Sequence, residues 1–504
     1  MSRITLACLG FGTVLAVACG DARRDDDIVG VSTIPTSGAS NNDDDDDNGD
    51  ADGSTTGVRL DAGNDDGGNL GCLGDASCDE IDIVFVIDNS GTMAEEQLTL
   101  AANFSRLVER LQNLTDSGGN PVNPSVNIMV TTTDVGHPLC TPFQKPDYRP
   151  ARGEPIWEGC NARINRFTGL DPVNPKIVEE ACTTHCPVDV VPGDPFIHFS
   201  IAGSNVPNNN VAAALSCIGP QGIDGCGMEA QLESMLQAIN PAACWNDPSQ
   251  EHCQNDPKWS NVKRGFLRPK ATLALVIVTD EVDCSNQAPG GFSYFTNEND
   301  FWEVNPNIGI AQATSAVCWN AGVTCSGPDA NGVFTNCQSS DNGVLQPIER
   351  YTSYLEWVKQ EQGKEVVMLG ILGVPSVTAR NPEPPFEPIE GGVHALVYRD
   401  WVDGVYPEGD LTPEQVANGI DANWMRFDLG IGPGCNGYDE ATDTFTGQAV
   451  PPVRIKEVCE SLNRENADGT VDVRCCIESI CDQDFSAAID CLTGIISTSL
   501  PPAG

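Results

Sequence analysis

Short apolar runs alternate with amphipathic stretches over most of this chain. The apolar runs are predicted strands, and the most apolar of them, 82–87 and 271–280, are apolar on both faces, which is typical of buried strands in a parallel sheet. They occupy residues 82–87, 125–134, 195–201, 271–280, 365–374 and 471–480. The stretches between them have apolar residues at helical spacing, over residues 94–111, 211–217, 228–239, 347–360, 452–462 and 485–496. This alternation predicts an α/β fold with a Rossmann-like, doubly wound, mostly parallel sheet.

Two stretches interrupt the alternation and are rich in proline, glycine and cysteine. They cover residues 136–193 and 286–343, and we expect both to be long insertions tied by disulfides. Strands and helices continue to alternate on either side of each insertion. One enlarged α/β domain over residues 72–504 therefore explains the pattern better than two separate domains.

The N-terminal part of the chain has a different composition. An apolar run follows Arg3, is too short to span a bilayer comfortably, and ends in small residues before Cys19. Residues 1–19 resemble a bacterial lipoprotein signal peptide, in which Cys19 becomes lipidated; an ordinary secretory signal is the alternative. Residues 20–71 are dominated by Asp, Asn, Gly, Ser and Thr, which predicts a disordered acidic linker. Because Gly20 replaces the aspartate that signals inner-membrane retention, we expect an exported, outer-membrane lipoprotein, periplasmic or surface-exposed.

Cysteine usage agrees with export to an oxidising compartment. When Cys8 and Cys19 are set aside, 20 of the 22 cysteines remain, an even number suited to disulfides. Residues 182–186 (Cys-Thr-Thr-His-Cys) contain zinc-ligand types, but no second pair follows at a zinc-like spacing, so we expect disulfides there. Short spacings predict three local pairs: Cys72 with Cys78, Cys217 with Cys226, and Cys244 with Cys253. Three more cysteines are expected to be bridge partners: Cys475, Cys476 and Cys481.

The chain has many more acidic than basic residues, which limits the kinds of molecule that it can bind. The chain has 72 acidic and 27 basic residues, and its formal net charge is −45. A surface of this charge repels nucleic acid, so we expect no DNA or RNA binding. It favours cationic partners or bound cations.

Two of the most apolar strands end in an aspartate, Asp88 and Asp280. The carboxyl ends of parallel strands lie on one edge of a sheet, so both acids can meet at one site. Ser90 and Thr92 follow at alternating positions and add two hydroxyl oxygens, and hard divalent cations prefer oxygen ligands. The alternative is a capped helix, in which Ser90 or Thr92 accepts backbone donors at the start of residues 94–111.

The order of these residues resembles the metal-ion-dependent adhesion site of von Willebrand factor type A domains. The family's first motif, Asp-x-Ser-x-Ser, is matched by Asp88-Asn89-Ser90-Gly91-Thr92. Its distal Thr-Asp-Gly is matched by Thr279-Asp280, with Glu281 in the last place. The family's remaining ligand is a threonine that has no counterpart here; Glu229 is the nearest oxygen donor and Asp224 the second choice. The resemblance implies a divalent cation, magnesium or calcium, with manganese as a third candidate.

The resemblance also implies a non-enzymatic function in protein–protein binding or adhesion. Its partner is an unknown protein ligand whose acidic residue completes the shell of the metal, and the membrane contact is the N-terminal lipid. With Glu229, three carboxylates would over-neutralise a divalent ion, and such a site suits calcium better than magnesium. The alternative function is therefore a structural cell-envelope protein with a closed calcium site. Glu229 is otherwise a first-turn acid favoured by the helix dipole. A haloacid-dehalogenase phosphatase is a weaker alternative, because Ser90 stands where its second Asp is required.

Three other acids lie close to these motifs in the sequence. Asp134 also ends a strand, and is either a supporting acid at the same edge or an exposed turn acid. Glu281 and Asp283 are expected to be solvated loop charges. The sequence therefore predicts a metal site formed by Asp88, Ser90, Thr92, Glu229 and Asp280.

Overall fold

The computed structural model describes residues 79–170, 175–287, 290–439 and 444–502. All of them belong to one compact unit, Leu60–Gly504. The predicted signal peptide, the acidic linker, the lipidation residue Cys19 and the predicted pair of Cys72 and Cys78 lie outside the described residues. In the described ranges, no helix has both the length and the apolar character needed to cross a membrane.

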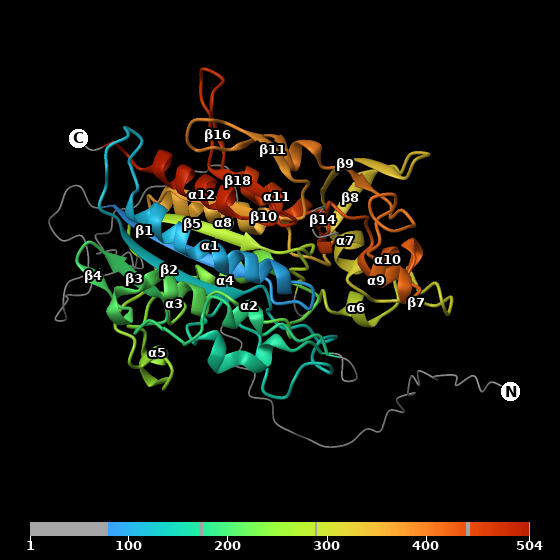
Figure 1. Cartoon of the computed structure of the whole chain (residues 1–504), viewed down its shortest axis with the longest axis horizontal. Coiled ribbons are helices and arrows are strands. Elements are labelled where there is room, and N and C mark those ends of the chain that lie inside the picture. The colour runs from blue at the N-terminus through green and yellow to red at the C-terminus, as the bar shows by residue number, and fades with distance from the viewer. Residues whose placement is uncertain (1–78, 171–174, 288–289, 440–443, 503–504) are drawn as a thin grey trace, which may run out of the picture. The chain divides into compact units, whose positions relative to one another are not determined.

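A seven-stranded sheet forms the centre of the fold (Figure 1). Its strands are β1 (Glu80–Ile87), β2 (Ser125–Thr132), β3 (Ile197–Ser200), β4 (Gly203–Ser204), β5 (Thr272–Val278), β10 (Val366–Leu372) and β18 (Cys475–Ser479). They lie in the order β18-β10-β5-β1-β2-β3-β4. The strands from β18 to β2 pair in parallel, whereas β3 and β4 form an antiparallel edge. The prediction of a mostly parallel α/β sheet is confirmed.

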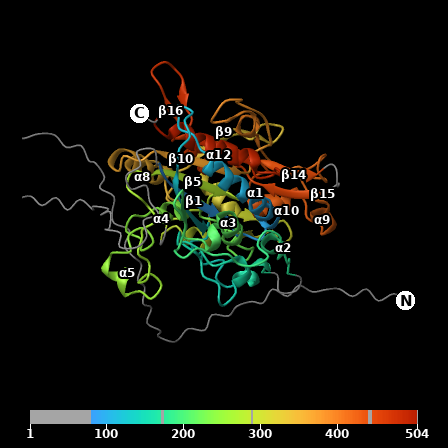
Figure 2. The same ribbon diagram turned by 60° about the vertical axis from the view of Figure 1, so that its left-hand side comes forward.

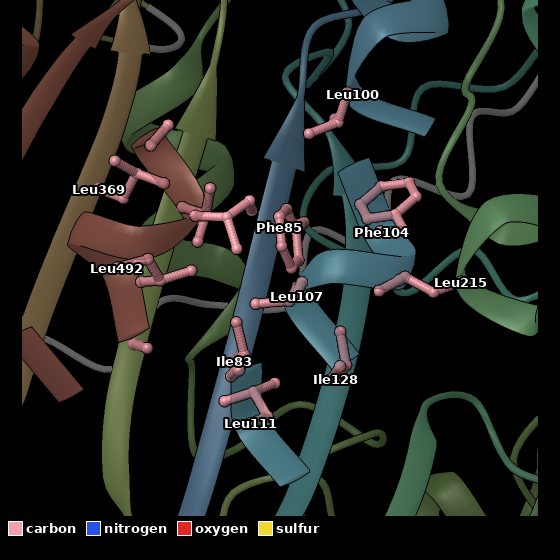
Figure 3. Close-up of a cluster of buried hydrophobic side chains, with 14 of the residues drawn as sticks. Ile83, Phe85, Leu100, Phe104, Leu107, Leu111, Ile128, Leu215, Leu369 and Leu492 are labelled. Atoms are coloured by element: carbon pink, nitrogen blue, oxygen red, sulfur yellow. The ribbon is translucent and has the colours of Figure 1, made fainter. Parts of the chain in front are cut away.

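Helices cover both faces of the sheet (Figures 1 and 2). One face carries α1 (Ala94–Gln112), α3 (Val211–Ile218) and α12 (Ser486–Ser499), and the other α4 (Gln231–Ala238), α8 (Ile348–Glu361) and α11 (Val453–Glu460). Each face of the sheet has its own hydrophobic core, and alternate residues of β1 point into one or the other. Ile83 and Phe85 belong to the core under α1, and Val84 and Val86 to the core under α4. The ring of Phe85 meets that of Phe104 edge to face, with centroids 5.8 Å apart (Figure 3). Because both faces of β1 are buried, residues 83–87 of this strand are all apolar.

Smaller elements fill the two insertions and the segment after β10. Residues 375–450, to which the sequence pattern assigned no element, hold short strands and helices. These strands are two to six residues long, too short for a clear period in the sequence. The remaining elements are η1 (Cys160–Phe167), α2 (Glu180–Thr183), η2 (Pro207–Asn209), α5 (Glu251–Asn255), α6 (Ser293–Thr296), β6 (Glu303–Val304), β7 (Ala311–Gln312), α7 (Ala316–Gly322), β8 (Val323–Ser326), β9 (Val333–Ser339), β11 (Val377–Arg380), β12 (Pro388–Gly391), η3 (Gly392–Ala395), β13 (Tyr398–Arg399), α9 (Pro413–Ala417), α10 (Ala422–Leu429), β14 (Cys435–Asp439), β15 (Thr444–Ala449), β16 (Arg464–Glu465) and β17 (Val471–Asp472).

Disulfides tie both insertions to the rest of the fold, as expected. The predicted pair of Cys244 and Cys253 is confirmed. The predicted pair of Cys217 and Cys226 is wrong, because Cys217 packs with the cysteines of the first insertion and bonds to one of them. The bridges of the described residues are Cys140–Cys226, Cys160–Cys182, Cys186–Cys217, Cys244–Cys253, Cys284–Cys318, Cys325–Cys337, Cys435–Cys481, Cys459–Cys475 and Cys476–Cys491.

This list includes every cysteine of the described ranges. Cys182 and Cys186 belong to two different bridges, which agrees with the expectation of disulfides rather than zinc at this run. Cys475, Cys476 and Cys481 are bridge partners, as expected. So dense a set of bridges indicates an oxidising environment outside the cytoplasm.

Candidate metal site at the carboxyl edge of the sheet

Acidic residues follow three adjacent strands at the carboxyl edge of the sheet. Asp88 comes directly after β1, Asp280 lies just beyond β5, and Asp134 just beyond β2. The structure thus brings Asp88 and Asp280 to the same edge, as predicted. Glu229 joins them from the segment before α4, where the amide of Ala230 donates to the carbonyl of Thr133 at 3.0 Å. We call Asp88, Asp134, Glu229 and Asp280 the edge acids.

The loop after β1 wraps its own polar groups around Asp88. The amide of Ser90 donates to Oδ1 of Asp88 at 2.8 Å, and the hydroxyl of Thr279 donates to Oδ2 at 2.5 Å. The hydroxyls of Ser90 and Thr92 lie 3.2 Å apart. Neither caps α1, because the N-cap residue is Met93 and no side chain caps it. The capped-helix alternative for these hydroxyls is therefore wrong.

Glu229 and Asp280 each keep one carboxylate oxygen without a partner. The hydroxyl of Thr133 donates to Oε2 of Glu229, but Oε1 has no hydrogen bond among the described residues. Likewise Oδ1 of Asp280 is buried and has no partner in the described part of the chain. A buried oxygen without a donor is costly, so both atoms are suited to a ligand that supplies positive charge.

Burial and mutual repulsion raise the pKa values of the edge acids. Burial raises the pKa of Asp88 to about 6, against hydrogen bonds from Thr279 and Ser90 that lower it. Burial and the nearby charge of Asp88 raise the pKa of Asp280 to about 8. The pKa of Glu229 lies well above its usual range, first because of burial and then because of Asp88 and Asp134. The folded protein thus holds these carboxylates in an environment that disfavours their charge.

Several buried acids elsewhere in this protein have a basic partner, and the edge acids do not. Asp82, at the opposite end of β1, pairs with Arg268 at 2.8 Å. Asp283 pairs with Arg454 at 2.9 Å, and both side chains are almost fully buried. Among the ion pairs of the described residues, none includes an edge acid. A cation at the edge would supply the missing charge compensation.

Asp134, which is one of the edge acids, and the nearby Asp224 are held by other groups. Asp134 is buried, accepts the hydroxyl of Tyr148 at 2.6 Å and also binds the amide of Cys226. It is thus not an exposed turn acid, and through Tyr148 it supports Asn89 of the β1 loop. Asp224 forms ion pairs with Lys145 and Arg166, so its charge is already compensated.

The expectation of solvated charges fails for Asp283 and in part for Glu281. Asp283 is buried because it accepts the backbone amide of Leu232 at the start of α4 and pairs with Arg454. Glu281 is half-buried. Its pKa is raised well above the usual range by burial and by the charge of Asp280.

Sequence reasoning missed Glu96, a buried acid on α1. One of its carboxylate oxygens has no partner among the described residues, and the charge of Asp280 adds to burial in raising its pKa. Glu96 lies one helical turn before Leu100, on the apolar face of α1. That position was a usable signal, because an acid on an apolar helix face is seldom buried without a function or a partner.

The carboxylate oxygens of the edge acids do not all lie close to one another. Among the described residues, no three edge acids bring carboxylate oxygens within 4.8 Å of one another; the groups that do are Cys244 with His252 and Cys253, and Cys160 with Cys186 and Asp189. The cysteines of both groups are bridged, so they offer no thiolate. An ion at the edge would therefore take some of its oxygens from hydroxyls.

His137 lies in the first insertion, three residues after Asp134, and is buried against aromatic rings. Its ring centroid lies 4.5 Å from that of Phe295, and burial lowers its pKa to about 4. The unfolded chain takes up this proton near pH 6.5, so the free energy of unfolding falls as pH drops from about 6.5 to 4, by up to about 3 kcal/mol. Urea unfolding across this range should give a smaller pH slope for His137→Asn than for wild type; equal slopes would contradict the assignment.

This chain matches no protein-family model, and no curated protein resembles it significantly.

Proposed function

We propose that this protein is a non-enzymatic, metal-dependent binding or adhesion protein, similar to von Willebrand factor type A domains. One observation carries the proposal. The edge acids are buried without any basic partner among the described residues, whereas Asp82 and Asp283, which are buried elsewhere in the fold, are each paired with an arginine. Carboxylates at the carboxyl end of a parallel sheet, beside serine and threonine hydroxyls, fit a hard divalent cation.

The residues that would hold the ion come from three loops. Asp88, Ser90 and Thr92 lie in the loop after β1. Asp280 lies in the loop after β5, and Glu229 lies in the segment before α4. When bound, the ion would neutralise the carboxylates and attract an anionic group of a partner. Three carboxylates and two hydroxyls favour calcium, which takes six to eight oxygens, over magnesium, which demands a tighter octahedron; manganese is a third candidate.

Access from solvent supports binding of a partner. Gly91 and Thr92 are exposed, although Asp88 and Ser90, which precede them in the same loop, are buried. An ion held at this loop would therefore have one side toward solvent. On this proposal, an acidic residue of an unknown protein ligand completes the ion's shell there, and the disulfide-tied insertions supply the surrounding contact surface.

The proposed location is the cell envelope. The lipoprotein-like start of the chain would attach Cys19 to a membrane, most simply the outer membrane, and the acidic linker would separate the folded unit from it. The dense disulfides support a site outside the cytoplasm.

A structural role is the second candidate, and Glu229 is the observation that favours it. A third carboxylate reduces the residual charge on the ion and with it the attraction for an acidic partner. The protein would then be a cell-envelope component with a closed calcium site. The two candidates differ in whether the bound ion keeps a coordination position open.

Water-proton relaxation with manganese distinguishes these candidates. An ion with an open position carries an exchangeable water and should give a strong relaxation enhancement on binding to the oxidised chain. Acetate, standing in for a partner's carboxylate, should then displace the water and lower the enhancement. If manganese binds with little enhancement and acetate has no effect, the site is closed and the adhesion proposal fails in favour of the structural one.

A further inference from the structure

A second site-like feature lies along the same carboxyl edge, where β10 and β18 end. It is a cavity of about 560 Å³, lined by Ser376 after β10, by Asp482 and Asp484 after β18, and by Asn436 and Tyr438 of β14. The strand β15, which pairs with β14, contacts α1. Open α/β sheets bind ligands outside the carboxyl ends of their strands, and the cavity has this position.

Aromatic rings form one side of the cavity. Tyr406 and Tyr438 both line it, and their ring centroids lie 5.8 Å apart with the planes inclined by 53°. Phe445 packs edge to face against Tyr406, with centroids 6.2 Å apart, and so fixes the orientation of that ring. Two inclined tyrosine rings present π-electron density, which attracts cations and not anions.

The acids of the cavity carry negative charge that no basic residue balances directly. Neither Asp482 nor Asp484 takes part in an ion pair among the described residues. Arg380, whose charge acts on Asp482, is held by both carboxylate oxygens of Glu478. The hydroxyl of Ser376 donates to Asp482 at 2.5 Å and so keeps that carboxylate in place.

We propose that this cavity binds an organic cation, an ammonium or guanidinium group, between the rings of Tyr406 and Tyr438 and the carboxylates of Asp482 and Asp484. Rings and carboxylates act together on such a group, through cation–π attraction and charge-assisted hydrogen bonds. A bare metal ion would prefer oxygen ligands and leave the rings unused. A neutral ligand would gain no charge attraction from the two carboxylates, which already accept hydrogen bonds from Ser376 and Ser486. The site is separate from the proposed metal site and does not depend on it.

Ligand-observed NMR with the oxidised full chain tests this proposal, with EDTA present so that the metal site has no part in the result. The probes are choline, its neutral isostere 3,3-dimethylbutan-1-ol, and arginine amide. We expect both cations to bind and the neutral alcohol to bind about tenfold more weakly or not at all. Tyr406→Leu should weaken choline binding about tenfold, whereas Tyr406→Phe, which keeps the aromatic face, should retain it.

The two Tyr406 variants have the same net charge as wild type, so a loss in Tyr406→Leu alone excludes general attraction by the acidic surface. Asp482→Asn should also weaken choline binding. Equal binding of the neutral alcohol, unchanged choline binding in Tyr406→Leu, or no binding of either cation to wild type would overturn the proposal.

Discussion

Asp88→Asn should abolish the stabilisation of this protein by divalent cations. For wild type, a cation at 100 times its dissociation constant should raise the free energy of unfolding by about 2.7 kcal/mol. The variant keeps the shape of the side chain and an acceptor for Ser90, but it removes the central carboxylate of the site. Without metal, at pH 8, the variant should be at least as stable as wild type, because burial raises the pKa of Asp88 to about 6 and the ionised group is unfavourable there.

Asp82→Asn is the matched control, since Asp82 is a buried acid at the other end of the same strand. It should lose stability, because Arg268 and Lys364 then lack their carboxylate, yet it should keep the full response to metal. Thermal unfolding with calcium and with EDTA measures both effects. A metal response that survives in Asp88→Asn, or disappears equally in Asp82→Asn, would place the ion elsewhere.

Arg454→Met should be among the most destabilising single substitutions in the molecule. The Arg454 and Asp283 side chains are only 2% and 0% exposed. The substitution therefore leaves the carboxylate of Asp283 buried without its cationic partner. Breaking a buried pair by removing one member costs about 3–5 kcal/mol. The loss also reaches α4, because the same carboxylate accepts the amide of Leu232 at the start of that helix. Urea unfolding of the oxidised chain provides the measurement.

Arg106→Met is the control for this substitution, because its partner Asp490 is shared with Arg110 and the pair is partly exposed. We expect a cost of about 0–1 kcal/mol there. Adding Asp283→Asn to Arg454→Met should restore part of the lost stability, since the uncompensated charge is then gone. Similar losses for Arg454→Met and Arg106→Met would refute the role given to the buried pair.

Strand ends were the part of the candidate site that the sequence could predict. A run that is apolar on both faces identifies a central strand, and the first acid after it must lie at the carboxyl edge. The sequence alone therefore places Asp88 and Asp280 on the same edge. Ser90 and Thr92 follow within the same loop, so their positions were predictable for the same local reason.

The contacts that depend on distant segments could not be predicted in this way. Arg454 lies 171 residues after Asp283. No local sequence pattern therefore distinguishes Asp283 from a solvent-exposed aspartate in a turn. The hydroxyl of Thr133 meets Glu229 only because β2 and the segment before α4 come together at the edge. The same limit applies to the prediction of disulfides. Cys244 and Cys253 are only 9 residues apart and form a local bridge, whereas Cys217 bonds to Cys186 across 31 residues.

Calorimetric titration of the oxidised chain with calcium, magnesium and manganese tests most directly whether the edge acids hold a divalent cation. Our account predicts saturable binding of at least one of these ions, preferably calcium, with Glu229→Gln weakening calcium more than magnesium. The absence of binding by all three ions to the folded, oxidised protein would contradict it, because the buried carboxylates would then remain without any compensating charge.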